Sequence, residues 1–127
     1  MQKILITGSN GQLGTKLKQL CPAHMQVTYT DYQELDITNE TAVLSFMSDL
    51  KPDVVINAAA YTAVDKAETD KETAHAVNAA AVGYLAKACA QIKARFIHIS
   101  TDFIFDGSKQ TPYLPNDAAN PLSVYGE

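Results

Sequence analysis

Three glycines recur at every third position near the start of the chain, within the stretch TGSNGQLG at residues 7–14. The apolar run at residues 3–7 precedes them and predicts a buried strand. The following residues predict a helix from about Gly11 to Leu20, with its apolar face formed by Leu13, Leu17 and Leu20. Because glycine destabilises the interiors of strands and helices, three of them at this junction indicate a backbone that turns sharply and approaches another group closely.

The position of the glycines between strand and helix suits the binding of a dinucleotide pyrophosphate. Gly8 would permit the sharp turn, Gly11 would let the backbone approach the phosphates, and Gly14 would let the helix pack close to the sheet. The helix N-terminus then offers free N–H groups to an anion. The spacing is G-x-x-G-x-x-G rather than G-x-G-x-x-G, so a glycine-rich turn without a ligand is the alternative.

Asp31 ends the second predicted strand (residues 26–30), where a carboxylate about 20 residues after the glycines can accept hydrogen bonds from the adenosine ribose. Its charge would repel a 2′-phosphate, which slightly favours NADH over NADPH. Asp36 and Ile37 follow and are placed to flank the adenine. The structural alternatives are a turn residue for Asp31 and a helix-start carboxylate for Asp36.

The rest of the chain continues the alternation of strands and helices. Thr38 or Asn39 caps a second predicted helix that ends at Leu50, and an alanine-rich third helix spans roughly residues 72–91. Further strands are predicted at residues 54–56 and 95–100. The order β-α-β-α-β-α-β predicts an α/β fold, the amino-terminal part of a Rossmann-like doubly wound parallel sheet, followed by a long loop.

Composition narrows the class of protein. The chain has 127 residues, enough for one domain, and its net charge of −4 without a Lys/Arg cluster argues against nucleic acid. No apolar run approaches the ~20 residues of a membrane span, and no signal-like segment precedes the first strand. Cys21 and Cys89 are isolated and are interpreted as small core residues, so we expect a cytoplasmic protein. No metal site is expected, because His24, His75 and His98 share no ligand spacing.

Three further motifs are specific: NAAAYTAVDKAE at residues 57–68, STDFIFDG at 100–107 and PLSVYG at 121–126. Together with the glycine run they resemble the extended short-chain dehydrogenase/reductases, most closely the dTDP-4-dehydrorhamnose reductase branch. The resemblance covers the whole chain. It implies NADH- or NADPH-dependent reduction of the 4-keto group of a dTDP-sugar substrate, dTDP-4-dehydro-L-rhamnose, with no nucleic acid or membrane as partner.

The resemblance also implies roles for individual residues. Thr101 matches the catalytic Ser/Thr that holds the ketone oxygen, Asp102 lies beside the sugar, and Tyr125 matches the tyrosine that donates the proton. Without the resemblance, Thr101 would be interpreted as a cap and Tyr125 as a loop aromatic. The implied cofactor-binding residues are Gly8, Gly11, Gln12, Leu13, Asp31, Asp36, Ile37, Ala60, Tyr61, Thr62 and Tyr125.

The family pairs its tyrosine with a lysine four positions later, which would fall at position 129, after Glu127. We therefore expect residues 1–127 to be the NAD(P)-binding Rossmann domain of a longer reductase, truncated before that lysine and lacking the carboxy-terminal substrate region. The isolated chain is expected to be inactive. The full-length parent is compatible with a homodimer.

Two other functions fit parts of the pattern. A related epimerase or dehydratase is one, although a dehydratase would need an acidic residue at the position of Phe103. A non-catalytic NAD(P)-binding subunit, resembling the regulatory subunit of methionine adenosyltransferase, is the other. The presence of both Thr101 and Tyr125 favours catalysis.

A charged cluster follows the third predicted strand. Asp65, Lys66 and Glu68 are interpreted as solvated residues at the start of a helix. The alternative is that they order the loop near the sugar.

Overall fold

A four-stranded parallel sheet organises the chain, which the computed structural model describes over residues 1–127. The strand order is β2-β1-β3-β4, and every neighbouring pair runs parallel. The bounds are β1 Lys3–Thr7, β2 Gln26–Tyr29, β3 Val54–Asn57 and β4 Arg95–His98. This confirms the predicted α/β class, with β4 two residues shorter than expected.

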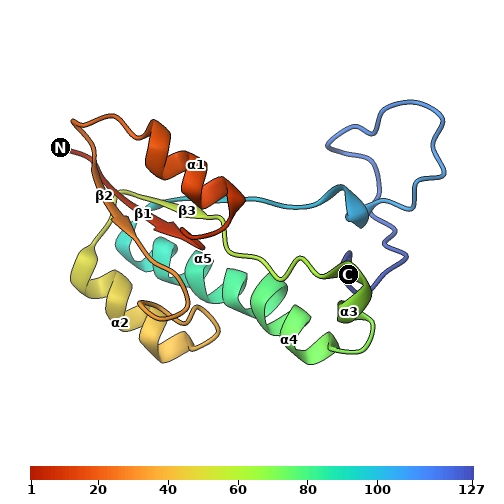
Figure 1. Cartoon of the computed structure of the whole chain (residues 1–127), viewed down its shortest axis with the longest axis horizontal. Helices are drawn as coiled ribbons and strands as arrows, with labels where there is room; N and C mark the ends of the chain where they lie inside the picture. The colour runs from red at the N-terminus through yellow and green to blue at the C-terminus, as the bar shows by residue number, and fades with distance from the viewer.

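Helices cover both faces of the sheet, with α1 on one face and α2 and α5 on the other (Figure 1). The predicted helix at residues 72–91 is interrupted by a π-helical segment, and a short helix and a 3₁₀ turn were not predicted from the sequence. The bounds are α1 Gln12–Leu20, α2 Glu40–Leu50, α3 Val64–Ala67, α4 Lys71–His75, the π-helical η1 Ala76–Ala80, α5 Ala81–Ile92 and the 3₁₀ turn η2 Asp102–Ile104.

The ends of α2 follow from its sequence. Asn39 caps the helix, since its side chain accepts a hydrogen bond from the Ala42 N–H at 3.1 Å. At the other end Lys51 adopts a left-handed conformation (φ 47°) and donates its N–H to the Met47 carbonyl. Pro52 follows and cannot continue the helix.

The core lies between the sheet and the α2–α5 layer. Leu5 and Val55 lie opposite each other on β1 and β3 and are fully buried. They belong to one cluster with Val43 and Met47 of α2 and Leu85 of α5. The core cluster therefore lies on one face of the sheet.

The predicted apolar face of α1 is wrong in part. Leu13 and Leu20 are exposed, Leu17 is half-buried, and the one buried residue of α1 is Gly14. The helix packs through its glycine because its backbone, rather than a leucine, contacts the preceding loop.

The two cysteines differ in their surroundings. Cys89 of α5 is buried in the core, as predicted, and burial raises the pKa of its thiol to about 11. Cys21, just after α1, is half-buried and outside the core cluster, so the core interpretation is wrong for it. Both thiols are free.

The strand order creates a crevice between β1 and β3. The connection from β1 leads to β2 on one side of β1, whereas β3 and β4 lie on its other side. In open parallel sheets, ligands bind at such a reversal, outside the carboxyl ends of the strands. The residues after β1 and after β3 therefore form the two sides of a candidate binding site.

The chain after η2 forms a loop that lies apart from the sheet before the chain returns beside α3 (Figure 1). Asp106 organises this loop by accepting hydrogen bonds from the Ser108 N–H (2.9 Å) and hydroxyl (2.7 Å), the Tyr113 hydroxyl (3.1 Å) and the Asn120 amide (2.9 Å). Hydrogen bonds, with those from Ser108 first, hold the pKa of Asp106 far below its usual value.

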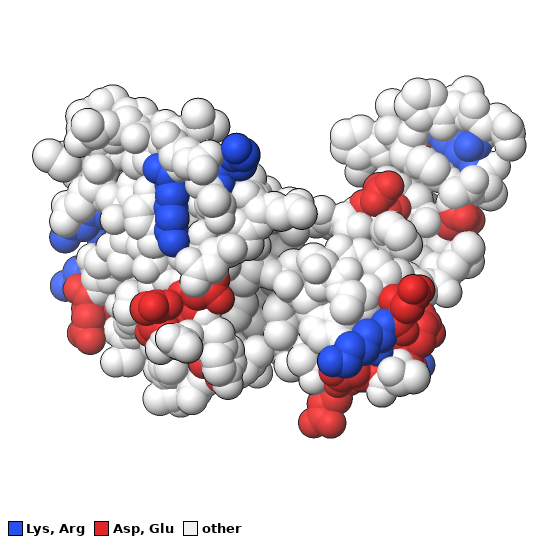
Figure 2. Space-filling model, viewed as in Figure 1, with Lys and Arg blue, Asp and Glu red and all other residues white.

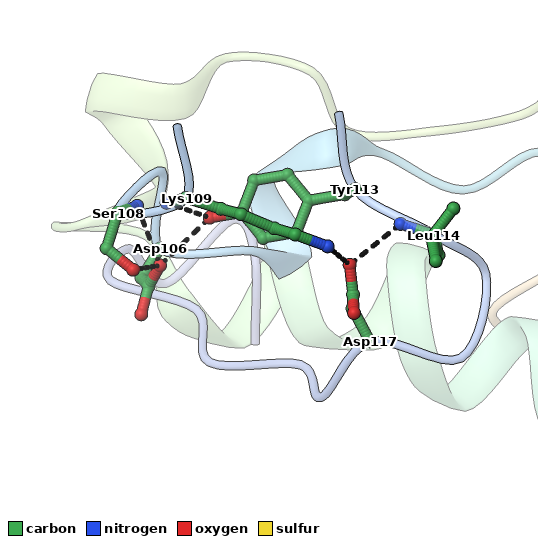
Figure 3. Close-up of polar contacts among 6 residues, drawn as sticks. All are labelled: Asp106, Ser108, Lys109, Tyr113, Leu114 and Asp117. Carbon is green, nitrogen blue, oxygen red and sulfur yellow. Dashed lines mark hydrogen bonds and ion pairs between the residues drawn. The ribbon is translucent and has the colours of Figure 1, made fainter. Parts of the chain in front are cut away.

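A second carboxylate completes the same network (Figure 3). Asp117 pairs with the Lys109 ammonium and accepts the Leu114 N–H at 2.8 Å. Phe105 stacks on Tyr113 with ring centroids 4.3 Å apart. The loop is therefore ordered by its own side chains, independently of the sheet.

Candidate functional site

The glycine loop is in direct contact with the turn after β3. Gly8 has φ +65°, and a Cβ there would collide with the backbone of Ala59. Gly11 precedes α1, which begins without any side-chain cap. The first N–H groups of α1 therefore remain available to an anionic ligand at the crevice.

Asp31 connects the end of β2 to the glycine loop. Its carboxylate accepts the Asn10 N–H and the Tyr32 N–H, each at 2.9 Å. Asp31 is thus a turn residue, as the structural alternative supposed, and it also lines a cavity of about 590 Å³ with Gly8 and Gly11.

This smaller cavity is lined by Asp31, Asp36 and Ile37, the residues expected around an adenosine. Ala60, which is expected to line the cofactor after β3, also lines it. Asp36 also accepts hydrogen bonds from the Thr38 N–H (2.9 Å) and hydroxyl (2.6 Å), both at Oδ1. Asp36 therefore orders the approach to α2 while forming part of the cavity wall.

A larger cavity, of about 1240 Å³, extends over the other side of the glycine loop. Gly11 and Ala58–Ala60 line both cavities, so the two cavities adjoin at the crevice between β1 and β3. The other predicted site residues that line the larger cavity are Gln12, Leu13, Thr62, Thr101 and Tyr125. Residues separated by more than a hundred positions thus line one cavity.

Tyr61 and Asp102 line neither cavity. The Tyr61 hydroxyl points to Asp70, with an Oη–Oδ2 distance of 3.4 Å, and desolvation together with this carboxylate raises the pKa of Tyr61. The Tyr61 side chain is therefore directed toward Asp70, whereas its neighbours Ala60 and Thr62 line the larger cavity.

Asn78, which sequence reasoning missed, holds the Tyr61 backbone. Its Oδ1 accepts the Tyr61 N–H at 2.8 Å, and its Nδ2 donates to the Tyr61 carbonyl at 2.9 Å. Asn78 lies in the middle of η1, and π-helical segments are frequent at functional sites. A polar amide within an alanine-rich helical run was the signal available in the sequence.

Thr101 combines a capping role with a place in the larger cavity. Its hydroxyl accepts the Phe103 N–H at 3.2 Å and caps η2. Phe103 in turn contacts Tyr125 edge to face, with ring centroids 5.4 Å apart. Gly126 packs so closely on the Phe103 carbonyl that a Cβ would collide with it. The segment that carries Tyr125 is therefore anchored beside Thr101.

Glu68 provides another anchor for this segment. Its Oε1 accepts the Val124 N–H at 3.0 Å, across 56 positions of sequence. Glu68 is exposed, as the solvated interpretation expects, and its hydrogen bond also orders the C-terminal segment, as the alternative supposed. No hydrogen bond ties the side chains of Asp65 and Lys66 to the rest of the chain.

Three polar side chains lie in register across the ends of adjacent strands. Thr7, Asn57 and His98 end β1, β3 and β4 respectively. The Thr7 hydroxyl donates to Asn57 Oδ1 at 2.6 Å, and Asn57 Nδ2 lies 3.1 Å from His98 Nδ1. Asn57 Oδ1 also accepts the Ala59 N–H at 3.2 Å. We refer to Thr7, Asn57 and His98 as the polar ladder.

Basic and acidic side chains are interspersed on the face shown in Figure 2, with no continuous basic patch. No His, Cys, Asp and Glu side chains form a group of three or more suited to a metal ion. None of the helices combines the length and the apolar character that a membrane span requires.

The strand order, the crevice at the β1–β3 reversal and the glycine loop define a Rossmann-type α/β domain. A profile of the family described as "RmlD substrate binding domain" matches residues 1–127. The chain belongs to this family.

Several of the relatives it matches are dTDP-4-dehydrorhamnose reductases. The one from Aggregatibacter actinomycetemcomitans is 45% identical over 129 residues, covering 100% of this chain and 44% of the relative. The one from Mycolicibacterium smegmatis is 48% identical, covering 98% and 38% respectively. The chain thus spans less than half the length of these relatives.

Solved structures agree with this assignment. The dTDP-4-dehydrorhamnose reductase of Clostridium acetobutylicum is 48% identical with a TM-score of 0.95, over 98% of this chain and 45% of that one. The Bacillus anthracis enzyme, solved in complex with NADP, is 35% identical with a TM-score of 0.95, over 99% and 46%. A UDP-glucose 4-epimerase from Brucella ovis, 20% identical with a TM-score of 0.85, shares the fold.

Proposed function

We propose that this chain is the cofactor-binding part of an NAD(P)H-dependent reductase that converts dTDP-4-dehydro-L-rhamnose to dTDP-L-rhamnose. The single observation that carries the proposal is the larger cavity, which the glycine loop, Thr101 and Tyr125 line together. The names of the relatives support the substrate, and the NADP complex of the Bacillus anthracis enzyme supports the cofactor.

The residues present fit a dinucleotide. The absence of a side chain at Gly8 and the uncapped start of α1 suit a pyrophosphate at the glycine loop. Asp31, Asp36 and Ile37 would hold the adenosine in the smaller cavity, and Gln12 and Leu13 extend the site toward the larger one. When bound, the reduced nicotinamide supplies the hydride.

The proton is supplied by the protein in this mechanism. The Thr101 hydroxyl hydrogen-bonds the 4-keto oxygen of the sugar, and the Tyr125 phenol donates a proton to that oxygen as its negative charge develops. Phe103, Gly126 and Glu68 keep Tyr125 beside Thr101. A lysine at position 129 of the parent would place a positive charge near the phenol and assist its loss of a proton, so we expect residues 1–127 alone to bind cofactor without turnover.

The test uses the full-length protein and Tyr125→Phe. The variant should lose at least about 100-fold in kcat, because it removes the proton donor. Its dissociation constant for NADPH should stay within about twofold, since phenylalanine keeps the edge-to-face contact with Phe103. An unchanged kcat would remove Tyr125 from the mechanism. A wild type that binds NADPH but never reduces the sugar would favour a non-catalytic binding subunit.

A further inference from the structure

The polar ladder fixes the protonation state of a histidine at the cofactor crevice. Asn57 Oδ1 accepts the Ala59 backbone N–H, which can only donate, so this atom must be the carbonyl oxygen. The amide nitrogen of Asn57 therefore faces His98 Nδ1 and donates to it. Nδ1 must then be an acceptor, so the neutral ring carries its proton on Nε2.

The same amide supports the wall of the site. The Ala59 N–H that Asn57 holds belongs to the Ala58–Ala60 turn, which lines both cavities. Gly8 packs directly against Ala59, so a shift of this turn would also move the glycine loop. The orientation of Asn57 therefore affects the positions of the Ala58–Ala60 turn and of the glycine loop.

We propose that His98 is a positioning residue for cofactor binding: as a neutral imidazole protonated on Nε2, it holds Asn57 in the orientation that supports the Ala58–Ala60 turn. This inference rests on the proposed function. Protonation of Nδ1 would place two donors head to head. Asn57 would then lose its hydrogen bond to His98. Alternatively, its side-chain amide would flip, and Oδ1 would no longer accept the Ala59 N–H.

The surroundings of His98 favour its neutral form. Although the side chain remains accessible to solvent, desolvation by the cavity wall lowers the pKa of His98. The other charged or titratable groups that line the same cavity are Lys71, Glu72 and His75 of α4, and Tyr125 and Glu127 of the C-terminal segment. No residue of α5 lines it, and β3 contributes the neutral turn that follows it.

The first measurement is the tautomer of His98 in the full-length protein, read from long-range ¹H–¹⁵N correlation spectra of the histidine rings. We expect Nε2–H at pH 7 and a pKa below the ordinary value. His98 as an Nδ1–H tautomer or a cation at pH 7 would overturn the inference, whether or not any cofactor binds.

The second measurement is the dissociation constant of NADPH between pH 8 and pH 5.5, taken as the ratio of variant to wild type so that titration of the cofactor cancels. His98→Asn can supply a carbonyl at the place of Nδ1 and cannot titrate, so it should match wild type at pH 8 and exceed its affinity by about fivefold at pH 5.5. His98→Leu should bind about fivefold more weakly at pH 8 because the acceptor is lost.

Two histidine variants make the pH effect specific. His24→Gln, at an exposed position outside both cavities, should follow wild type at every pH. If His75→Gln rather than His98→Asn removes the pH dependence, the inference is wrong. Binding of NADPH with no difference between His98→Asn and wild type would refute the inference alone, whereas no binding at any pH would refute the proposed function as well.

Discussion

Replacing Gly14 with alanine tests whether α1 packs through its backbone. Propensity alone favours the change, since alanine is better than glycine in a helix interior by about 1 kcal/mol. The new Cβ would, however, lie 2.5 Å from the Gly8 carbonyl oxygen and 2.5 Å from Ser9 Cα. Carbon atoms in contact sit about 3.5–4.0 Å apart, so the backbone would have to move by roughly 1 Å.

Because the obstructing atoms are backbone, they cannot rotate away, and the cost falls at the upper end of the ~1–3 kcal/mol typical of overpacking. We expect Gly14→Ala to lower the free energy of unfolding by about 2 kcal/mol once the propensity gain is subtracted. The glycine loop should shift with it, and the affinity for NADPH should fall by about tenfold or more.

Gly83→Ala is the matched control, because Gly83 also lies inside a helix and a Cβ there meets nothing within 4 Å. This variant should be more stable than wild type by about 0.5–1 kcal/mol. Urea unfolding followed by circular dichroism measures both variants, which should differ by about 3 kcal/mol. A Gly14→Ala protein as stable as Gly83→Ala would refute the packing described for α1.

Three further predictions concern the crevice and the loop after η2. Asp31→Asn should shift the ratio of the NADH and NADPH dissociation constants by about tenfold in favour of NADPH, because a negative charge near the 2′-phosphate is removed. Fluorescence titration measures both constants, and an unchanged ratio would contradict a place for Asp31 beside the ribose. Asn78→Asp replaces the donor to the Tyr61 carbonyl and should weaken NADPH binding by about fivefold, whereas Tyr61→Phe, which keeps the backbone contacts, should not. The pKa of Asp106 is lowered on folding, so this carboxylate stabilises the loop fully above its unfolded pKa near 4, and the stabilisation is lost as the pH falls toward the folded pKa. Asp106→Asn should therefore speed proteolysis of residues 105–120 more at pH 7 than at pH 3. Equal acceleration at the two pH values would count against this hydrogen-bond network.

The sequence predicted the elements whose signals are local. The four strands, the cap at Asn39 and the glycine turn at Gly8 depend on neighbours within a few positions, and the structure has all of them. The predicted face of α1 failed because leucine periodicity cannot tell whether a helix packs through side chains or through a glycine.

The contacts that hold the candidate site together could not be predicted from local sequence patterns. Asn78 meets Tyr61 across 17 positions, His98 meets Asn57 across 41, and Glu68 meets Val124 across 56. Each needs the relative placement of two elements, which strand and helix periodicity does not supply. The residues named from the family resemblance mostly line the two cavities, and their roles in binding and catalysis stay predictions until the variants are measured.

The reactivity of the buried Cys89 thiol can report how often the core of the protein opens. With a pKa of about 11, only about one thiol in a thousand is ionised at pH 8, and the side chain is shielded between α5 and the sheet. Iodoacetamide should therefore modify it only when α5 separates from the rest of the core cluster. In a Cys21→Ser background the rate of Cys89 alkylation measures how often α5 separates from the core. Slower alkylation in the presence of NADPH would show that cofactor binding stabilises the packing of α5.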